Sequence, residues 1–96
     1  MIIVATIKSL PGKSKEIEDA LREMVLNVKA EDETMIYILH RSKNDPDKFL
    51  MYEKYKNKAA FDHHSSTSYF KAFFDKIENL IAESPSIEMY DELAAK

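Results

Sequence analysis

The residues best suited to chemistry lie where a predicted strand leads into a short predicted helix. Residues 49–55 read Phe-Leu-Met-Tyr-Glu-Lys-Tyr, and two-residue alternation puts four of their side chains on one face: Phe49, Met51, Glu53 and Tyr55. A carboxylate on this otherwise apolar and aromatic face is costly to bury unless a partner or a reaction uses it. Partial burial would raise the pKa of Glu53 toward neutrality, which suits a general base that takes a proton from a carbon or a phenol.

A histidine follows closely on the short helix. His64 lies three and four residues after Phe61 and Ala60, so it shares their face of the helix. Its imidazole could act as an acid or base, or donate a hydrogen bond to an enolate or quinol oxygen. We therefore predict Glu53 and His64 as the catalytic residues. A purely structural role stays open for both: Glu53 could bond a backbone amide or a cation, and His64 could simply pack at the helix end.

Aromatic and methionine side chains accompany this pair. They would suit a pocket for a flat aromatic ligand, although such residues most simply form core. The predicted substrate-binding residues are Tyr55, Phe49, Met51, Phe61, Phe70 and Phe74. The neighbouring His63 is expected to point outward. Because adjacent histidines diverge on a helix and no His-x-x-x-His or carboxylate pair completes a site, no metal is expected.

Length and composition limit the class of protein. The 96 residues make a single domain over 1–96, and 45% apolar with 32% charged residues is typical of a soluble globular chain. No apolar run reaches the ~20 residues that span a membrane. A net charge of −3 with scattered lysines leaves no basic stripe for nucleic acid. The absence of cysteine excludes disulfides and thiolate zinc sites and favours a cytoplasmic location.

Apolar periodicity predicts a β-α-β-β-α-β order with one short additional helix. The predicted ranges are a strand over 2–8, a helix over 17–28, strands over 34–41 and 48–55, a short helix over 58–64, a helix over 70–81 and a strand over 86–90. An Asn-Asp-Pro-Asp turn at 44–47 joins the middle strands into an antiparallel hairpin. Two β-α-β units with right-handed crossovers give a ferredoxin-like α+β fold, in which an antiparallel sheet carries two helices on one face.

Both faces of this sheet are apolar, but the helices can cover only one. A monomer would expose a larger apolar patch than soluble monomers usually carry. We therefore predict a homodimer that forms face to face through the open side of the sheet. Its interface is expected to include Ile38, Leu50 and Tyr52, with His40 at the interface or its rim.

Several of these segments occur in the order found in one known family. They are residues 3–7, Pro11-Gly12-Lys13, Asn44-Asp45-Pro46, Phe49, Tyr52-Glu53-x-Tyr55, Ala59-Ala60-Phe61 and His64. In this the chain resembles antibiotic biosynthesis monooxygenase-like domains of the dimeric α/β-barrel superfamily. The resemblance implies a homodimeric, cofactor-independent monooxygenase that acts on a small aromatic or quinol-like compound, with O₂ as co-substrate.

The chain also departs from this family in places. Haem-degrading members carry an iron-binding histidine on the second long helix, and the matching position here is Phe74. No haem is expected without that ligand, and no other cofactor is expected either. The aromatic residue after the strand glutamate is commonly Trp, and here it is Tyr55.

Two alternative functions stay open. The first is isomerase-type processing of a small phosphorylated ketose-like compound, which the similarity of residues 52–56 to that branch of the family implies and which needs a cationic patch. The candidate cations are Lys54, Lys56, Lys58 and Arg41. The second is a non-catalytic dimeric binding domain whose own phenylalanines fill the pocket. An open apolar pocket touching Glu53 and His64 would favour the monooxygenase, and a mouth lined by lysine or arginine would favour the isomerase. The absence of a pocket would favour the binding domain.

Overall fold

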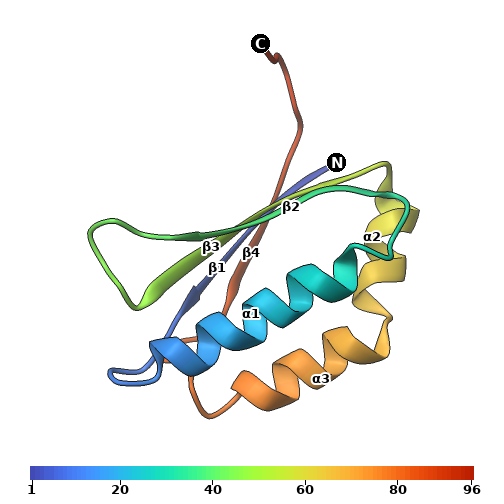
Figure 1. Cartoon of the computed structure of the whole chain (residues 1–96). Coiled ribbons are helices and arrows are strands. Elements are labelled where there is room, and N and C mark those ends of the chain that lie inside the picture. The colour runs from blue at the N-terminus through green and yellow to red at the C-terminus, as the bar shows by residue number, and fades with distance from the viewer.

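Seven helices and strands follow one another in the computed structural model, which describes residues 1–96 (Figure 1). They are β1 (Ile2–Lys8), α1 (Ser14–Val28), β2 (Thr34–Arg41), β3 (Lys48–Tyr55), α2 (Lys58–Ser65), α3 (Ser68–Ile77) and β4 (Ser86–Tyr90). The strands form one sheet in the order β2-β3-β1-β4, and every neighbouring pair is antiparallel. This is the ferredoxin-like α+β arrangement that the sequence predicts, and the four predicted strands are confirmed.

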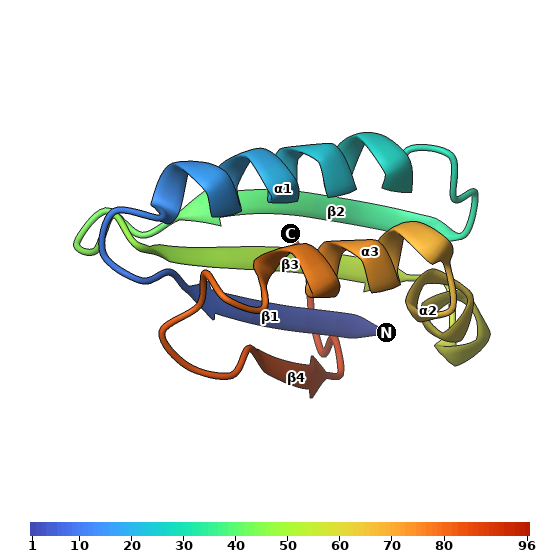
Figure 2. The ribbon, with the colours of Figure 1, turned by 90° about the horizontal axis from the view of Figure 1, so that it is seen from below.

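All three helices lie on one side of the sheet. α1 and α3 run side by side along it, α2 lies near one end, and β4 forms the edge beyond the helices (Figure 2). The main core fills the space between helices and sheet. α1 buries the stripe that its periodicity predicts: Ile17, Ala20, Leu21, Met24 and Val28.

α3 is shorter than the apolar pattern predicts. It ends at Ile77 rather than at residue 81. Backbone hydrogen bonds to the end of β1 and the segment after it draw the following residues off the helical path. Leu10 N donates to Leu80 O and Ala82 N donates to Lys8 O, each at 2.8 Å. Long-range pairing here overrides the local helical pattern.

A β-bulge changes which side chains of β2 face the helices. The register of β2 against β3 shifts at Met35, whose side chain is largely exposed. Strict alternation would have grouped Met35 with Tyr37 on one face. Beyond the bulge alternation holds, so Tyr37 pairs with Glu53 on the helix side and Ile38 pairs with Tyr52 on the open side.

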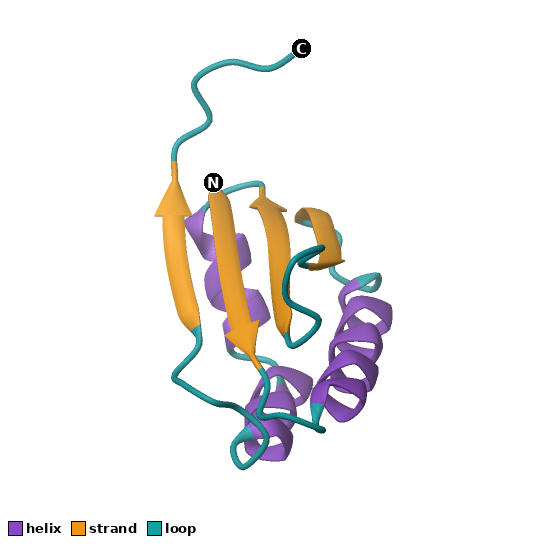
Figure 3. Ribbon diagram, turned by 90° about the vertical axis from the view of Figure 1, so that its left-hand side faces the viewer, coloured by secondary structure: helices purple, strands orange, loops and turns teal.

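The C-terminal strand is only partly covered. β4 pairs with β1 alone, and the chain after it runs away from the rest of the molecule (Figures 1 and 3). Ile87 and Met89 pair with Ala5 and Ile3 on the helix side. They are nevertheless 48% and 61% exposed, because no helix lies over β4. None of the three helices has the length and apolarity needed to cross a membrane.

Candidate active site

A small cavity lies between the sheet and the helices, and all seven elements contribute to its wall. Its volume is about 40 Å³, and 12 of its 14 lining residues are hydrophobic. The two others are Glu53 and His64. A space of this size holds a molecule comparable to water or O₂. An aromatic ligand would therefore enter only if the surrounding side chains move apart.

β3 places Glu53 on the helix side of the sheet, between Ile3 of β1 and Tyr37 of β2. The residue is only 4% exposed. Burial raises the pKa of its carboxyl to about 7, against the lowering effect of a 2.6 Å hydrogen bond that the Tyr55 hydroxyl donates to Oε1. Both the acid and the carboxylate are therefore populated at neutral pH, as a general acid–base group requires.

His64 occupies the last turn of α2. The helix begins where the Asn57 side chain accepts a 2.9 Å hydrogen bond from Ala60 N, a conventional N-cap. His64 itself is 1% exposed, and its ring lies 5.3 Å from the ring of Tyr37 and 5.2 Å from that of Phe70. This aromatic surrounding fixes the imidazole at the wall of the cavity.

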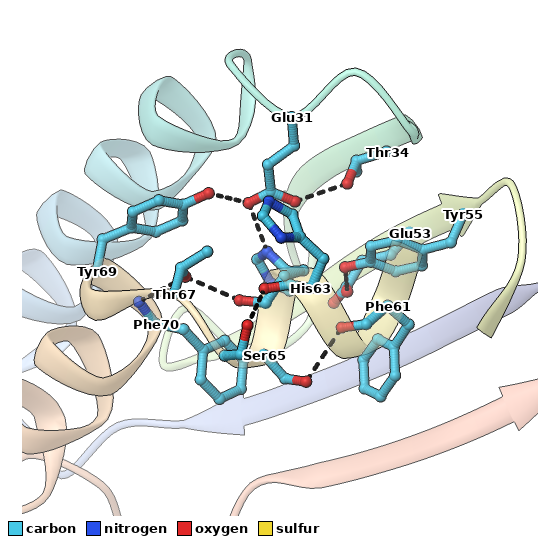
Figure 4. Close-up of polar contacts among 12 residues, drawn as sticks. Glu31, Thr34, Glu53, Tyr55, Phe61, His63, Ser65, Thr67, Tyr69 and Phe70 are labelled. Atoms are coloured by element: carbon cyan, nitrogen blue, oxygen red, sulfur yellow. Dashed lines mark hydrogen bonds and ion pairs between the residues drawn. The ribbon is translucent and has the colours of Figure 1, made fainter. Parts of the chain in front are cut away.

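Glu31 is the residue at this site that sequence reasoning missed. It lies in the loop after α1 and is buried. Its Oε2 lies 2.9 Å from His64 Nδ1 and also accepts a hydrogen bond from the Tyr69 hydroxyl, while its Oε1 accepts one from the Thr34 hydroxyl at 2.7 Å. Figure 4 shows Tyr69 and Thr34 reaching the carboxylate from opposite sides. Burial alone would raise the pKa of Glu31, but these three hydrogen bonds together lower it.

One sequence signal points to the acidic loop of residues 31–33, although it does not distinguish Glu31 from its two acidic neighbours. An acidic group just beyond the C-terminus of a helix meets the negative end of the helix dipole. The last turn of α1 contains no basic residue to compensate. An acid in that position is best explained by partners from elsewhere in the fold, although the sequence does not reveal which they are.

The cavity gathers most, but not all, of the predicted substrate-binding residues. Met51, Phe61, Phe70 and Phe74 line it together with the predicted catalytic pair. Tyr55 is fully buried behind Glu53 and packs against Phe61 with their ring centres 5.4 Å apart.

Phe49 lies elsewhere, at an open groove of about 520 Å³ between α1 and β2. The Arg41 guanidinium covers its ring at 5.2 Å from the centroid. Phe49 is thus a core residue beneath a cation rather than part of the cavity wall. Tyr37, which was not among the predicted binding residues, lines both spaces.

The candidate phosphate-binding cations do not reach the cavity. Each forms an ion pair with an acid, and the pairs are Lys54–Glu92, Lys56–Glu33, Lys58–Asp62 and Arg41–Glu18. None of the four cations belongs to the cavity wall. No group of three histidine or acidic side chains is arranged to hold a metal ion.

The other two histidines lie outside the cavity. His63 is exposed and borders a separate hollow that Glu31 also lines. His40 is exposed on the open side of the sheet, where its Nδ1 lies 3.3 Å from Leu50 O.

The chain thus combines a ferredoxin-like domain with one acid and one imidazole in the wall of an apolar cavity. Residues 1–76 match the family described as antibiotic biosynthesis monooxygenase, and the chain belongs to this family. The crystal structure of PA3566 from Pseudomonas aeruginosa is similar, with 31% identity, a TM-score of 0.91 and coverage of 97% of this chain and 93% of that chain.

Two curated relatives are more distant in sequence. YcnE of Bacillus subtilis is 29% identical over 82 residues, covering 85% of this chain and 86% of YcnE. Protein sll1783 of Synechocystis is 27% identical over 90 residues. The match covers 94% of this chain but only 61% of sll1783, so the chain spans less than two thirds of that relative.

Proposed function

We propose that the protein is a cofactor-independent monooxygenase that oxidises a small, electron-rich aromatic compound of the phenol, quinol or anthrone type. The observation that carries this proposal is the composition of the cavity. Glu53 and His64 are the two acid–base groups in a wall that is otherwise hydrophobic and rich in phenylalanine. Such a wall suits a flat, uncharged ring, and the family of the chain is consistent with oxygenation.

The reaction needs no reductant other than the substrate. The substrate hydroxyl gives its proton to an acid–base group of the cavity wall as the substrate passes one electron to O₂. The resulting substrate radical and superoxide combine to form a carbon–oxygen bond. The product of this step is a hydroperoxide once the peroxide oxygen has received a proton. Glu53 then removes the hydrogen on the same carbon, the O–O bond breaks, and the leaving hydroxide takes up a proton as water. One oxygen atom remains on the ring as a new carbonyl.

The surroundings of Glu53 support its role in this step. A carboxyl with a pKa of about 7 can both accept the carbon-bound proton and return it to the leaving hydroxide at neutral pH. The apolar wall excludes water, which strengthens electrostatic interactions at the reacting atoms. Ile87, which is about half exposed on the helix side of the edge strand β4, also lines the cavity, so we infer that a ligand enters at this edge of the sheet.

Oxygen uptake tests this proposal directly. The wild-type chain should consume O₂ with members of a panel of anthrones, naphthols and quinols, with one O₂ used per carbonyl formed. Glu53→Gln should lower the rate by about 10²–10⁴-fold. Glu33→Gln makes the same chemical change at an exposed residue and should leave the rate unchanged. Conversion of phosphorylated ketoses without oxygen uptake would instead identify an isomerase.

We also propose that the working unit is a homodimer formed through the open side of the sheet. Ile38, Leu50 and Tyr52 lie on that side, and Ile38 is about half exposed. A second copy with the same apolar face would cover these residues. Tyr52→Lys should shift the sedimentation coefficient at micromolar concentration toward that of a monomer. Leu26→Lys, on the exposed side of α1, should not. A wild-type chain that sediments as a monomer at this concentration contradicts the proposal.

A further inference from the structure

The site contains two buried carboxylates in opposite surroundings. Both oxygens of Glu31 are occupied, by donors from His64, Tyr69 and Thr34. Glu53 accepts a single hydrogen bond, from Tyr55 to Oε1, and lines the cavity. Glu31 is not among the residues of the cavity wall and lies behind His64. The mechanism above uses Glu53 and leaves Glu31 without a role.

The contact with Glu31 determines which nitrogen of His64 carries a hydrogen. The lowered pKa of Glu31 keeps this residue ionised at neutral pH. An ionised carboxylate only accepts hydrogen bonds, so Nδ1 must be the donor across the 2.9 Å contact. The other ring nitrogen, Nε2, forms no hydrogen bond within the chain. In the neutral ring Nε2 therefore has a free lone pair, and His64 is part of the cavity wall.

We propose that Glu31 is a positioning residue of this active site, which holds His64 with Nδ1–H on its carboxylate and leaves Nε2 to bind the hydroxyl of the aromatic substrate. This inference rests on the proposed function. As the substrate gives its electron to O₂, the hydroxyl proton passes to Nε2, and the imidazolium lies against the negative Glu31. The proton then moves from Nε2 to the peroxide oxygen, which completes the hydroperoxide and restores the neutral ring.

This arrangement divides the two protons of the reaction between two groups. His64 carries the hydroxyl proton, and Glu53 carries the carbon-bound proton. Glu31 touches neither the substrate nor O₂. Its carboxylate sets the orientation of the imidazole and stabilises its positive charge, as the buried aspartate does for the histidine of a Ser-His-Asp triad.

The first test measures the tautomer of His64 by long-range ¹H–¹⁵N correlation spectra of the ¹⁵N-labelled chain at pH 8. The wild type should show hydrogen on Nδ1 and a bare Nε2. Glu31→Gln should lose this preference, because the glutamine amide can donate to Nδ1 and leave the hydrogen on Nε2. Glu33→Gln, two residues away and exposed, is the matched control and should keep the wild-type tautomer. A wild-type ring with its hydrogen on Nε2 overturns the proposal, even if Glu31→Gln does not fold.

The second test measures turnover of a compound that the wild type oxidises. Glu31→Gln should lower kcat by about 10–100-fold, because an Nε2 that already carries a hydrogen cannot accept the hydroxyl proton. KM should change little, because Nε2–H can still donate a hydrogen bond to the hydroxyl oxygen. A folded Glu31→Gln chain with wild-type kcat overturns the role of Glu31 while the proposed function stands. A wild-type chain that oxidises none of the anthrones, naphthols or quinols overturns the proposed function itself.

Discussion

Replacing Glu53 with glutamine should change the pH dependence of folding stability. In the unfolded chain this carboxyl has the ordinary pKa of 4.5, whereas in the folded chain the pKa is about 7. The folded chain binds the proton of Glu53 more tightly than the unfolded chain does. The contribution of the protonated acid to folding stability is therefore fully present below pH 4.5 and is lost as the pH rises through 7. Each tenfold change in the ionisation equilibrium is worth about 1.4 kcal/mol, so the loss approaches about 3 kcal/mol by pH 9.

Glutamine stays neutral throughout and still offers an oxygen to the Tyr55 hydroxyl. The free energy of unfolding of Glu53→Gln, measured by urea titration from pH 4 to pH 9, should therefore gain about 3 kcal/mol relative to wild type over that range. Glu33→Gln should follow the wild-type curve, since that side chain is exposed. Parallel curves for Glu53→Gln and wild type would show that burial does not raise the pKa of Glu53, and the acid–base assignment would fail with it.

Three further changes have definite expected outcomes. Tyr55→Phe removes the hydrogen bond that lowers the pKa of Glu53, so a ¹³C carboxyl titration should show Glu53 ionising at a higher pH than in wild type; an unchanged titration would contradict this. Asn57→Ala removes the N-cap of α2 and should cost about 1 kcal/mol in urea unfolding, whereas Asn44→Ala in an exposed turn should cost much less; equal losses would contradict the capping role. Hemin should give no stoichiometric ferric–histidine spectrum, because Phe74 stands where haem-degrading relatives carry the iron ligand; a sharp one-to-one complex would refute this.

The sequence was sufficient for the fold because its local patterns and its global pairing agree. Alternation defines β3, and the stripe on α1 has a helical period that only one buried face can satisfy. The apolar pattern gave a wrong prediction where contacts between distant residues determine the backbone conformation. Met35 leaves the alternation because a bulge interrupts the ladder, and α3 ends early because residues 80 and 82 pair with the chain around residues 8 and 10. Neither contact has a local signature.

The candidate site was also predictable only in part. The location of Glu53 and His64 at one cavity was predictable, because each lies on a face that its own period defines and the faces of neighbouring elements meet in this topology. The partner of His64 was not predictable. Glu31 precedes His64 by 33 residues and lies in a loop, where no periodic pattern predicts the direction of a side chain. Phe49 shows the converse limit, because it shares the face of Glu53 but packs beneath Arg41 at the groove between α1 and β2 and not in the cavity wall.

Glu53 has few hydrogen-bond donors around it. This is the strongest reason to assign it a function rather than a structural role. An ionised carboxylate offers about four lone-pair sites, and in this chain only the Tyr55 hydroxyl occupies one of them. Glu31 is similarly buried, but it has three donors and a lowered pKa. A carboxylate whose role was to hold its neighbours in place would be surrounded by donors, as Glu31 is. Glu53 instead costs stability when it ionises and has an apolar cavity beside it for a ligand. Glutamine at this position should therefore make the empty protein more stable above pH 7 while removing turnover, a pair of opposite changes that a purely structural carboxylate would not produce.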